Sequence, residues 1–193
     1  MEKGRFVLVT GPSGAGKDTL IAGARERLGG DERFVFPERL ITRDCLPEAE
    51  RHGTISRDAF ARMTAEGRYA LAWEAHGLGY VIPREVAEMV TAGRIAVCNV
   101  SRRIVPDALA RFAGTHVLYV DADRSVRAGR LAARGRESRQ DIEARLARDV
   151  PDFPADLPVT RIDNSGTLDM GVTAFVAALA ALADQGNSTR RTA

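Results

Sequence analysis

The sequence predicts an α/β protein in which a parallel sheet carries helices on both faces. Short apolar runs alternate with segments whose apolar residues recur at helical spacing, at both ends of the chain. Near the N-terminus, an apolar run, a glycine-rich stretch and a helical pattern follow one another directly. The chain has 193 residues, of which 45% are hydrophobic, and this length and composition suit one domain with a sizeable core.

Four short segments are expected to form the strands of this sheet. Three of them are apolar runs without the polar alternation of a half-exposed strand, as is typical of a strand buried on both faces, and they are residues 5–9, 95–100 and 117–120. Residues 159–162 are the expected last strand. Helices are expected from Lys17 to Gly29, over 101–112, after Asp123 and over 167–183.

Residues 36–92 interrupt this alternation with shorter elements, and we interpret them as an insertion into a core of residues 1–35 and 93–185. Parallel α/β sheets bind ligands at the carboxyl ends of their strands, so the insertion should lie over that edge. Its expected elements are extended pieces at 33–36 and 39–42, a helix after Ser56, strands at 69–73 and 80–82 around a turn at 76–79, and a helix from Pro83 to Gly93.

The glycine-rich stretch has the G-x-x-x-x-G-K pattern of a phosphate-binding P-loop. Glycines allow backbone N–H groups to turn inward around an anion, and the following helix adds its positive N-terminal end. The lysine places a compact ammonium against the β- and γ-phosphates of a nucleotide. The pattern predicts an ATP-binding segment made of Gly11, Pro12, Ser13, Gly14, Ala15, Gly16, Lys17, Asp18 and Thr19.

The choice of basic residues supports a working phosphate site. Of the 28 basic residues, Lys3 and Lys17 are lysines and the other 26 are arginines. A lysine nevertheless stands in the loop, where a compact point charge suits the phosphates better than a broad guanidinium fork.

Asp18 departs from the motif, which has Ser or Thr at this position. Two interpretations remain open. Asp18 can hold Mg²⁺ directly or through water, because a carboxylate is a good hard oxygen ligand. Alternatively, Asp18 only favours the helix N-terminus and Thr19 supplies the hydroxyl.

A second candidate is the arginine-rich segment of residues 130–148. Phosphoryl transfer needs positive groups that offset charge on the transferring and leaving oxygens, brought in by a segment that closes and excludes water. Arginines around a glycine between two helices suit this mobile lid, and a solvated, salt-bridged helical face is the alternative. The predicted catalytic groups are Lys17, Arg134, Arg136 and Arg145.

Composition excludes several other classes of protein. The net charge of +2 gives no support for nucleic-acid binding. Cys45 and Cys98 fit no metal or disulfide spacing, and with no long apolar run or signal peptide we expect a cytoplasmic protein without membrane contact. Residues 1–185 are expected to form the single domain, and residues 186–193 a loose tail. Oligomeric state is not predicted.

Taken together, these motifs resemble the guanylate-kinase-like branch of the P-loop kinases. The matching features are Gly-Pro-Ser-Gly-Ala-Gly-Lys at 11–17, Ile-Thr-Arg at 41–43, Ser56 with Phe60, Trp73 to Tyr80, and Arg134-Gly-Arg136 with Arg145. Guanylate kinases read guanine with two carboxylates. When the chain is aligned on Trp73, Ala72 and Asn99 stand in their places, although a shifted alignment would offer Glu74. A site without these carboxylates leaves guanine donors unpaired.

Further matches narrow the resemblance to one family within this branch. They are Asp18, Ile-Thr-Arg-Asp at 41–44, Trp73, His-Gly-Leu at 76–78, Tyr80, and Asn-Val-Ser-Arg at 99–102 with Pro106 and Ala108. In this set the chain is most similar to the ribose 1,5-bisphosphate phosphokinases of phosphonate degradation. That resemblance implies transfer of the γ-phosphoryl group of ATP to α-D-ribose 1,5-bisphosphate, with the 5-phosphate expected as acceptor and 5-phospho-α-D-ribose 1-diphosphate as product.

The residues expected to bind this sugar phosphate are Arg43 and Arg102 for its phosphates and Tyr80, Asn99 and Ser101 as hydrogen-bond donors. A small substrate with two phosphates and no base needs cations and hydroxyls but no base-reading carboxylates. The alternatives are a kinase of the same architecture acting on GMP, and a guanylate-kinase-like interaction module without catalysis. Intact loop glycines and Lys17 argue against the module.

Overall fold

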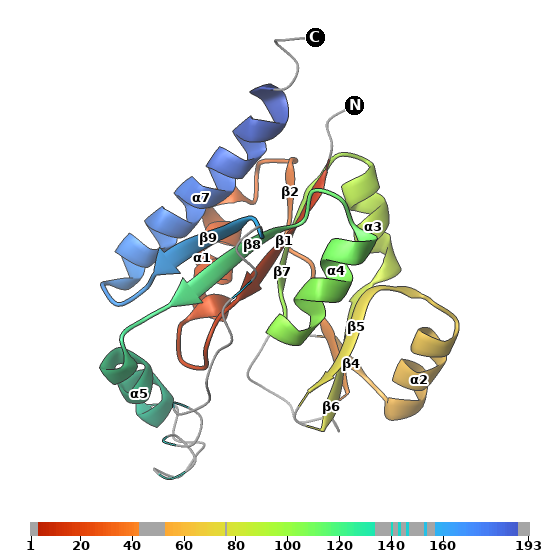
Figure 1. Ribbon diagram of the computed structural model, residues 1–193, viewed down its shortest axis with the longest axis horizontal. Helices are drawn as coiled ribbons and strands as arrows, with labels where there is room; N and C mark the ends of the chain where they lie inside the picture. The colour runs from red at the N-terminus through yellow and green to blue at the C-terminus, as the bar shows by residue number, and fades with distance from the viewer. Residues whose placement is uncertain are drawn as a thin grey trace.

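The computed structural model describes residues 4–42, 53–75, 77–133, 140, 143, 146, 153 and 157–188. Its centre is a five-stranded sheet in the order β2-β7-β1-β8-β9 (Figure 1), and every neighbouring pair is parallel. The strands are β1 (Arg5–Thr10), β2 (Phe34–Val35), β7 (Ile95–Asn99), β8 (His116–Asp121) and β9 (Val159–Asp163). The predicted fold class is confirmed.

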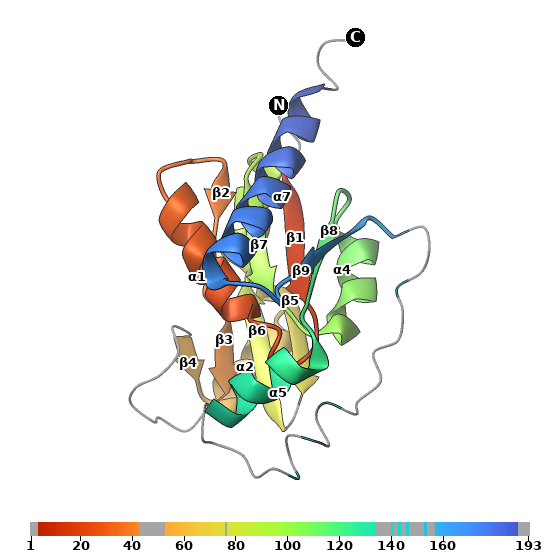
Figure 2. The ribbon, with the colours of Figure 1, turned by 90° about the vertical axis from the view of Figure 1, so that its left-hand side faces the viewer.

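Helices cover both faces of this sheet (Figure 2). Alternate residues of β1 point to opposite faces, so Val7 and Val9 enter one hydrophobic core while Phe6 and Leu8 enter the other. The first core is closed by α1 (Lys17–Leu28) and α7 (Leu168–Ser188). The second is closed by α3 (Arg84–Thr91), the 3₁₀ turn η1 (Arg102–Ile104) and α4 (Val105–Arg111).

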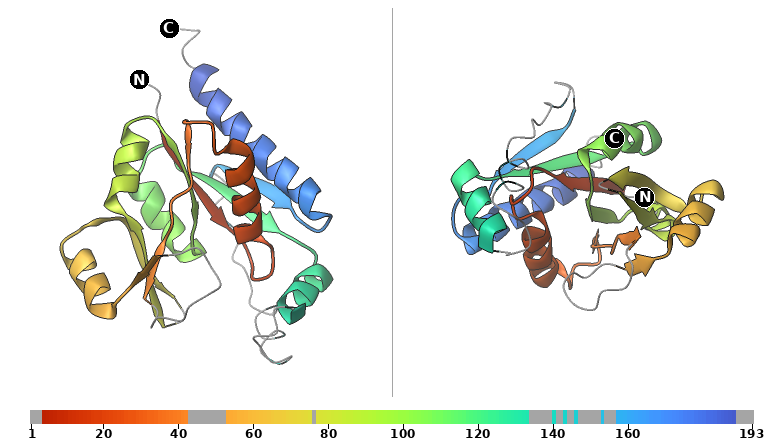
Figure 3. Two further views of the ribbon diagram at one scale, coloured as in Figure 1. Left: turned by 180° about the vertical axis from the view of Figure 1, so that it is seen from behind. Right: turned by 90° about the horizontal axis from the view of Figure 1, so that it is seen from below.

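The described residues of the predicted insertion include a second sheet in the order β4-β3-β6-β5. Its elements are β3 (Leu40–Thr42), β4 (Gly53–Ile55), α2 (Arg57–Ala65), β5 (Tyr69–Ala75) and β6 (Leu78–Pro83). Ser56 caps α2 as predicted, because its hydroxyl accepts a hydrogen bond from the Ala59 N–H at 3.1 Å. The second sheet lies beyond the carboxyl end of β1, and α5 (Arg124–Ala133) lies on the other side of that end (Figures 1 and 3).

Three element boundaries differ from the sequence-based prediction. The hairpin turn is shorter than expected, because Leu78 and Gly79 pair with Ala75 and Glu74 and belong to β6. Pro83 stands immediately before α3 rather than inside its first turn. The helix α7 runs to Ser188, so the tail does not begin at Gly186. A helix already anchored in the core is extended at little cost in free energy, since each added residue gains one hydrogen bond.

The helix α7 also corrects the expectation that the chain has no long apolar run. Its residues Leu168–Gln185 have the length and composition to cross a membrane. In the structure Val172, Phe175 and Leu179 of this helix are buried in the core that α7 shares with α1. Packing inside the protein accounts for their hydrophobicity.

Candidate phosphate and acceptor site

The phosphate loop, residues 11–17, connects β1 to α1 and depends on three glycines with positive φ. Gly11, Gly14 and Gly16 have φ angles of 145°, 80° and 91°. A Cβ atom at Gly11 would lie 1.9 Å from the Val120 carbonyl oxygen, and one at Gly16 would lie 2.4 Å from the Asn164 amide nitrogen. Both the backbone angles and the close contacts therefore require glycine, as the motif predicts.

Lys17 is the first residue of α1, and its side chain turns back over the phosphate loop. Its ammonium donates hydrogen bonds to the carbonyl oxygens of Gly11 at 2.9 Å and Pro12 at 3.1 Å. These contacts hold the charge beside the loop rather than along the helix. The geometry supports the predicted role of Lys17 as a point charge for phosphates.

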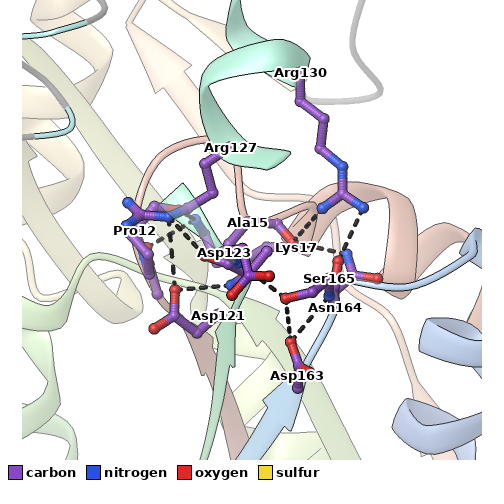
Figure 4. A network of polar contacts seen from close by, with 12 residues as sticks. Pro12, Ala15, Lys17, Asp121, Asp123, Arg127, Arg130, Asp163, Asn164 and Ser165 are labelled. Carbon is purple, nitrogen blue, oxygen red and sulfur yellow. Dashed lines mark hydrogen bonds and ion pairs between the residues drawn. The ribbon is translucent and has the colours of Figure 1, made fainter. Parts of the chain in front are cut away.

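Behind the phosphate loop, Asn164 links it to the connection between β9 and α7 (Figure 4). The side chain is only 2% exposed. Its amide group donates to the Ala15 carbonyl at 2.7 Å, and its backbone N–H donates to the Asp121 carbonyl at 2.8 Å. Among the residues that the structure describes, the buried side-chain oxygen of Asn164 has no hydrogen-bond partner. Sequence reasoning missed this residue, although a polar side chain just after the last predicted strand was a usable signal.

Two arginines of α5 hold the same region from outside (Figure 4). Arg130 donates to the Asn164 carbonyl at 2.9 Å and, at 3.5 Å, to that of Ala15. Arg127 donates to the Ala122 carbonyl at 2.9 Å and lies 3.8 Å from the Asp121 carboxylate. The arginine-rich segment thus begins with Arg130, which contacts the phosphate loop at Ala15, and Arg127 just before it holds the end of β8.

Asp18 lies at the exposed start of α1, where it meets the end of β7. Its carboxylate accepts a hydrogen bond of 2.5 Å from the side-chain amide of Asn99. This contact joins the proposed metal ligand to a predicted substrate-binding residue. It places Asn99 close to the phosphate loop, as expected for a residue at the carboxyl end of a parallel strand.

The second sheet contributes an aromatic stack to the same edge. The rings of Trp73 and Tyr80 lie parallel, with centroids 5.3 Å apart and an interplanar angle of 5°. The Arg39 guanidinium carbon lies 5.6 Å from the centroid of the Tyr80 ring, and Arg39 also donates to the Asn99 carbonyl at 3.4 Å. Sequence reasoning missed Arg39, because nothing distinguishes it from the other 25 arginines until the chain is folded.

Ser101 and Arg102, two further predicted substrate-binding residues, each have a partner within the protein. The Ser101 hydroxyl accepts from the Arg103 N–H at 3.4 Å and so caps η1. Arg102 interacts electrostatically with Tyr119 of β8, and burial lowers the pKa of its guanidinium. One terminal nitrogen of Arg102 is buried, and it has no hydrogen-bond partner in the part of the chain that the structure describes. Burial also raises the pKa of the Tyr119 phenol, an effect reinforced by Asp121.

The remaining predicted site residues, Arg43, Arg134, Arg136 and Arg145, lie outside the described residues. The described part of the site therefore brings together the phosphate loop, Asp18, Asn99, Tyr80 and Arg39.

The structure bears on Glu74, the alternative base-reading carboxylate. Glu74 and Gly79 are cross-strand partners, so their side-chain positions share a face of the second sheet. A Cβ atom at Gly79 would lie 2.8 Å from the Phe60 ring of α2. Glu74 consequently lies on the α2 face, opposite the face that carries Trp73 and Tyr80.

A magnesium site at this edge would rest on few protein ligands. Among the residues that the structure describes, no group of three His, Cys, Asp or Glu side chains could hold a metal. Magnesium bound with a nucleotide takes most of its ligands from phosphates and water, and needs only one or two protein oxygens. The exposed carboxylate of Asp18 and the hydroxyl of Thr19, directly after Lys17, fit that requirement.

Comparison with known sequences gives close relatives over nearly the whole chain. Ribose 1,5-bisphosphate phosphokinase PhnN of Brucella melitensis is 45% identical over 174 residues, which cover 90% of this chain and 91% of that protein. The protein of the same name from Methylobacterium radiotolerans is 46% identical over 178 residues, covering 92% and 98% of the two chains. No protein-family model matches the chain.

Comparison with solved structures identifies the fold. Guanylate kinase from Anaplasma phagocytophilum superposes with a TM-score of 0.63 at 16% identity, covering 93% of this chain and 87% of the other. A gluconokinase from Sinorhizobium meliloti gives a TM-score of 0.53 at 18% identity, covering 100% of both chains. The predicted guanylate-kinase-like architecture is confirmed.

Proposed function

The chain belongs to the family of ribose 1,5-bisphosphate phosphokinases, and we propose that it transfers the γ-phosphoryl group of ATP to α-D-ribose 1,5-bisphosphate. The products are 5-phospho-α-D-ribose 1-diphosphate and ADP. The observation that carries the proposal is the 45% identity to a relative of that name over 90% of this chain. The phosphate loop, with three glycines that tolerate no side chain and a lysine folded over them, supports the use of ATP.

The chemistry of the product fixes the accepting group. Because the diphosphate of the product is on C1, the 1-phosphate accepts the phosphoryl group, which corrects the expectation of the 5-phosphate. A bond forms between a 1-phosphate oxygen and the γ-phosphorus, and the bond from γ-phosphorus to the β,γ-bridging oxygen breaks. That oxygen leaves with its electron pair on ADP. The attacking oxygen is already ionised near neutral pH, since a phosphate monoester has a second pKa of about 6, so no general base is required.

The protein's own contribution is positioning and charge. The backbone N–H groups of the phosphate loop and the start of α1 bind the nucleotide phosphates, and Lys17 offsets charge on their β and γ groups. Arg134, Arg136 and Arg145 would add charge and exclude water as a lid. Asp18, or Thr19 beside it, would hold Mg²⁺, which when bound neutralises part of the charge between the β- and γ-phosphates.

Specificity against GMP follows from missing carboxylates. Ala72 has no side-chain acceptor, Glu74 lies on the α2 face, and Asn99 offers a neutral amide oxygen where a carboxylate is expected. A guanine at this site would lack the carboxylates that pair with its ring and exocyclic N–H groups, and each donor left unpaired costs about 1–3 kcal/mol.

The proposal is tested by a coupled ADP-release assay with ATP and Mg²⁺, in which ribose 1,5-bisphosphate and GMP are offered separately. We expect turnover with the bisphosphate and at least about 30-fold lower kcat/KM with GMP, the lower bound for losing two carboxylate acceptors at about 1 kcal/mol each. Phosphorus NMR of the product would locate the new diphosphate on C1. Turnover with GMP alone would show instead a nucleoside monophosphate kinase, and no ADP release with either acceptor would contradict the proposed reaction.

A further inference from the structure

Arg39 stands at the boundary between the second sheet and the end of β7. It immediately precedes β3, and its terminal nitrogen donates to the main-chain carbonyl of Asn99 at 3.4 Å. The side-chain amide of the same Asn99 donates to Asp18, the residue after Lys17. Asn99 and Asp18 therefore link Arg39 to the end of the phosphate loop, and Arg39 lies on the side of the insertion.

The Arg39 side chain rests on a rigid aromatic platform. Its guanidinium lies over the Tyr80 ring, and Tyr80 stacks in turn on Trp73, which is 8% exposed. A guanidinium held over an aromatic ring keeps its in-plane N–H donors directed sideways, away from the ring. The stacked rings and the Asn99 carbonyl thus hold the guanidinium at this position beside the end of β7.

Arg39 also has N–H donors that make no hydrogen bond to the described residues. Guanidinium carries five N–H donors, and the one hydrogen bond found for Arg39 goes to a neutral carbonyl. Among the described residues, no carboxylate forms an ion pair with it. A half-buried, pre-oriented cation of this kind suits a bidentate phosphate contact.

The position of Arg39 selects one of the two phosphates of the acceptor. The phosphate that accepts must approach the γ-phosphate beside Lys17, so the rest of the sugar extends away from the phosphate loop toward the second sheet. Arg39 lies in that direction, beyond Asp18 and Asn99. Resting on the proposed function, we infer that Arg39 binds the 5-phosphate of ribose 1,5-bisphosphate and so makes the enzyme selective for a doubly phosphorylated sugar.

The test compares two acceptors that differ only in that phosphate. Wild-type protein, Arg39→Gln and Arg39→Lys are assayed with ribose 1,5-bisphosphate and with α-D-ribose 1-phosphate, which keeps the accepting group and lacks the 5-phosphate. With the bisphosphate, Arg39→Gln should lower kcat/KM by about 10- to 100-fold, the range expected for a charge-assisted hydrogen bond, and Arg39→Lys by less. With ribose 1-phosphate, all three proteins should agree within about twofold.

Arg111→Gln is the matched control. Arg111 also lies over a tyrosine, with its guanidinium carbon 5.0 Å from the ring centroid of Tyr69. Tyr69 begins β5, whereas Tyr80 belongs to β6 and pairs with Trp73, further along β5. It should leave kcat/KM unchanged for both acceptors and reproduce any small change in melting temperature caused by losing an arginine–ring contact.

Three results would overturn the inference. An Arg39→Gln loss that is equal for the two acceptors would show that Arg39 supports the fold or the accepting phosphate. No loss with either would show that Arg39 only packs on Tyr80. Wild-type protein that turns over neither acceptor would refute the proposed function, and this inference with it, whereas wild-type turnover of the bisphosphate separates the two failures.

Discussion

Asp18 can act by binding Mg²⁺ or by holding Asn99, with which it forms a hydrogen bond of 2.5 Å. Variants of Asp18 and of Asn99 distinguish these two roles. If the carboxylate is a Mg²⁺ ligand, Asp18→Ala should raise the Mg²⁺ concentration for half-maximal rate by about tenfold, the effect of losing one hard oxygen ligand. Asn99→Ala removes only the hydrogen bond and should leave that concentration within about twofold.

The measurement is the Mg²⁺ dependence of turnover at fixed ATP for both variants and for the double variant. If Asp18 serves only to hold Asn99, the two single variants and the double variant will show equal losses and an unchanged Mg²⁺ dependence. Asp18→Ser serves as the second comparison, because it restores the hydroxyl usual at this position of the motif.

Residues differ in how far the sequence reveals them. Gly11, Gly16 and Lys17 were predictable because the constraint on each is local: a positive φ, or a side chain that reaches its own loop. Arg39 and Asn164 act through partners 60 and 149 positions away, and no short pattern records such contacts. Arg102 stays a predicted acceptor-binding residue, and its electrostatic interaction with Tyr119 of β8 is another long-range contact that no short pattern records.

At the scale of elements, the connection between β9 and α7 is tied to the phosphate loop by Asn164. We expect Asn164→Ala to lower the free energy of unfolding by about 1–3 kcal/mol, because the Ala15 carbonyl loses its buried donor. Asn164→Asp should cost more, since a carboxylate would face that carbonyl inside the protein. Both variants should raise the KM for ATP by loosening the loop.

Urea denaturation and ATP kinetics measure these two effects. Ser165→Ala is the matched control: its hydroxyl bonds only to exposed groups, the Asp163 carboxylate and the Asp123 N–H. It should cost less than about 1 kcal/mol. Equal effects of Asn164→Ala and Ser165→Ala would show that Asn164 contributes no special link.

Most strands were predictable because a parallel strand buried on both faces leaves a plain apolar run, and β1, β7 and β8 all follow such runs. The ends of the elements were less predictable than the elements themselves. Gly79 was expected in a turn, yet it pairs with Glu74 because the Thr42 hydroxyl accepts its N–H at 2.8 Å. That contact joins strands 37 residues apart, so only the assembled sheet sets the boundary.

For the whole molecule, His116 makes folding sensitive to pH far from the phosphate loop. It begins β8, and its ring contacts the Thr160 hydroxyl of β9 at 2.8 Å. Burial and, secondarily, Arg5 lower its pKa below the usual 6.5. The unfolded chain therefore binds a proton more readily than the folded one, and the free energy of unfolding should fall as the pH drops below about 6.5.

Urea midpoints between pH 8 and pH 5 check this expectation. His116→Gln, which keeps a polar side chain for Thr160, should flatten the pH dependence in this window. Asp31 and Asp163 also have lowered pKa values, but their contributions are lost only below their ordinary value of 3.8. A His116→Gln curve parallel to wild type would assign the pH dependence to other groups.

Because lysine is scarce in this chain, the phosphate loop can be probed with a reagent selective for amines. Lys3 and Lys17 are the two lysines of the chain. An acylating reagent aimed at amines can therefore modify few places, and one of them is the ammonium that sits on the Gly11 and Pro12 carbonyls. Peptide mass spectrometry after brief acylation then reports directly on whether a nucleotide shields that amine, without a spectroscopic tag or an engineered residue.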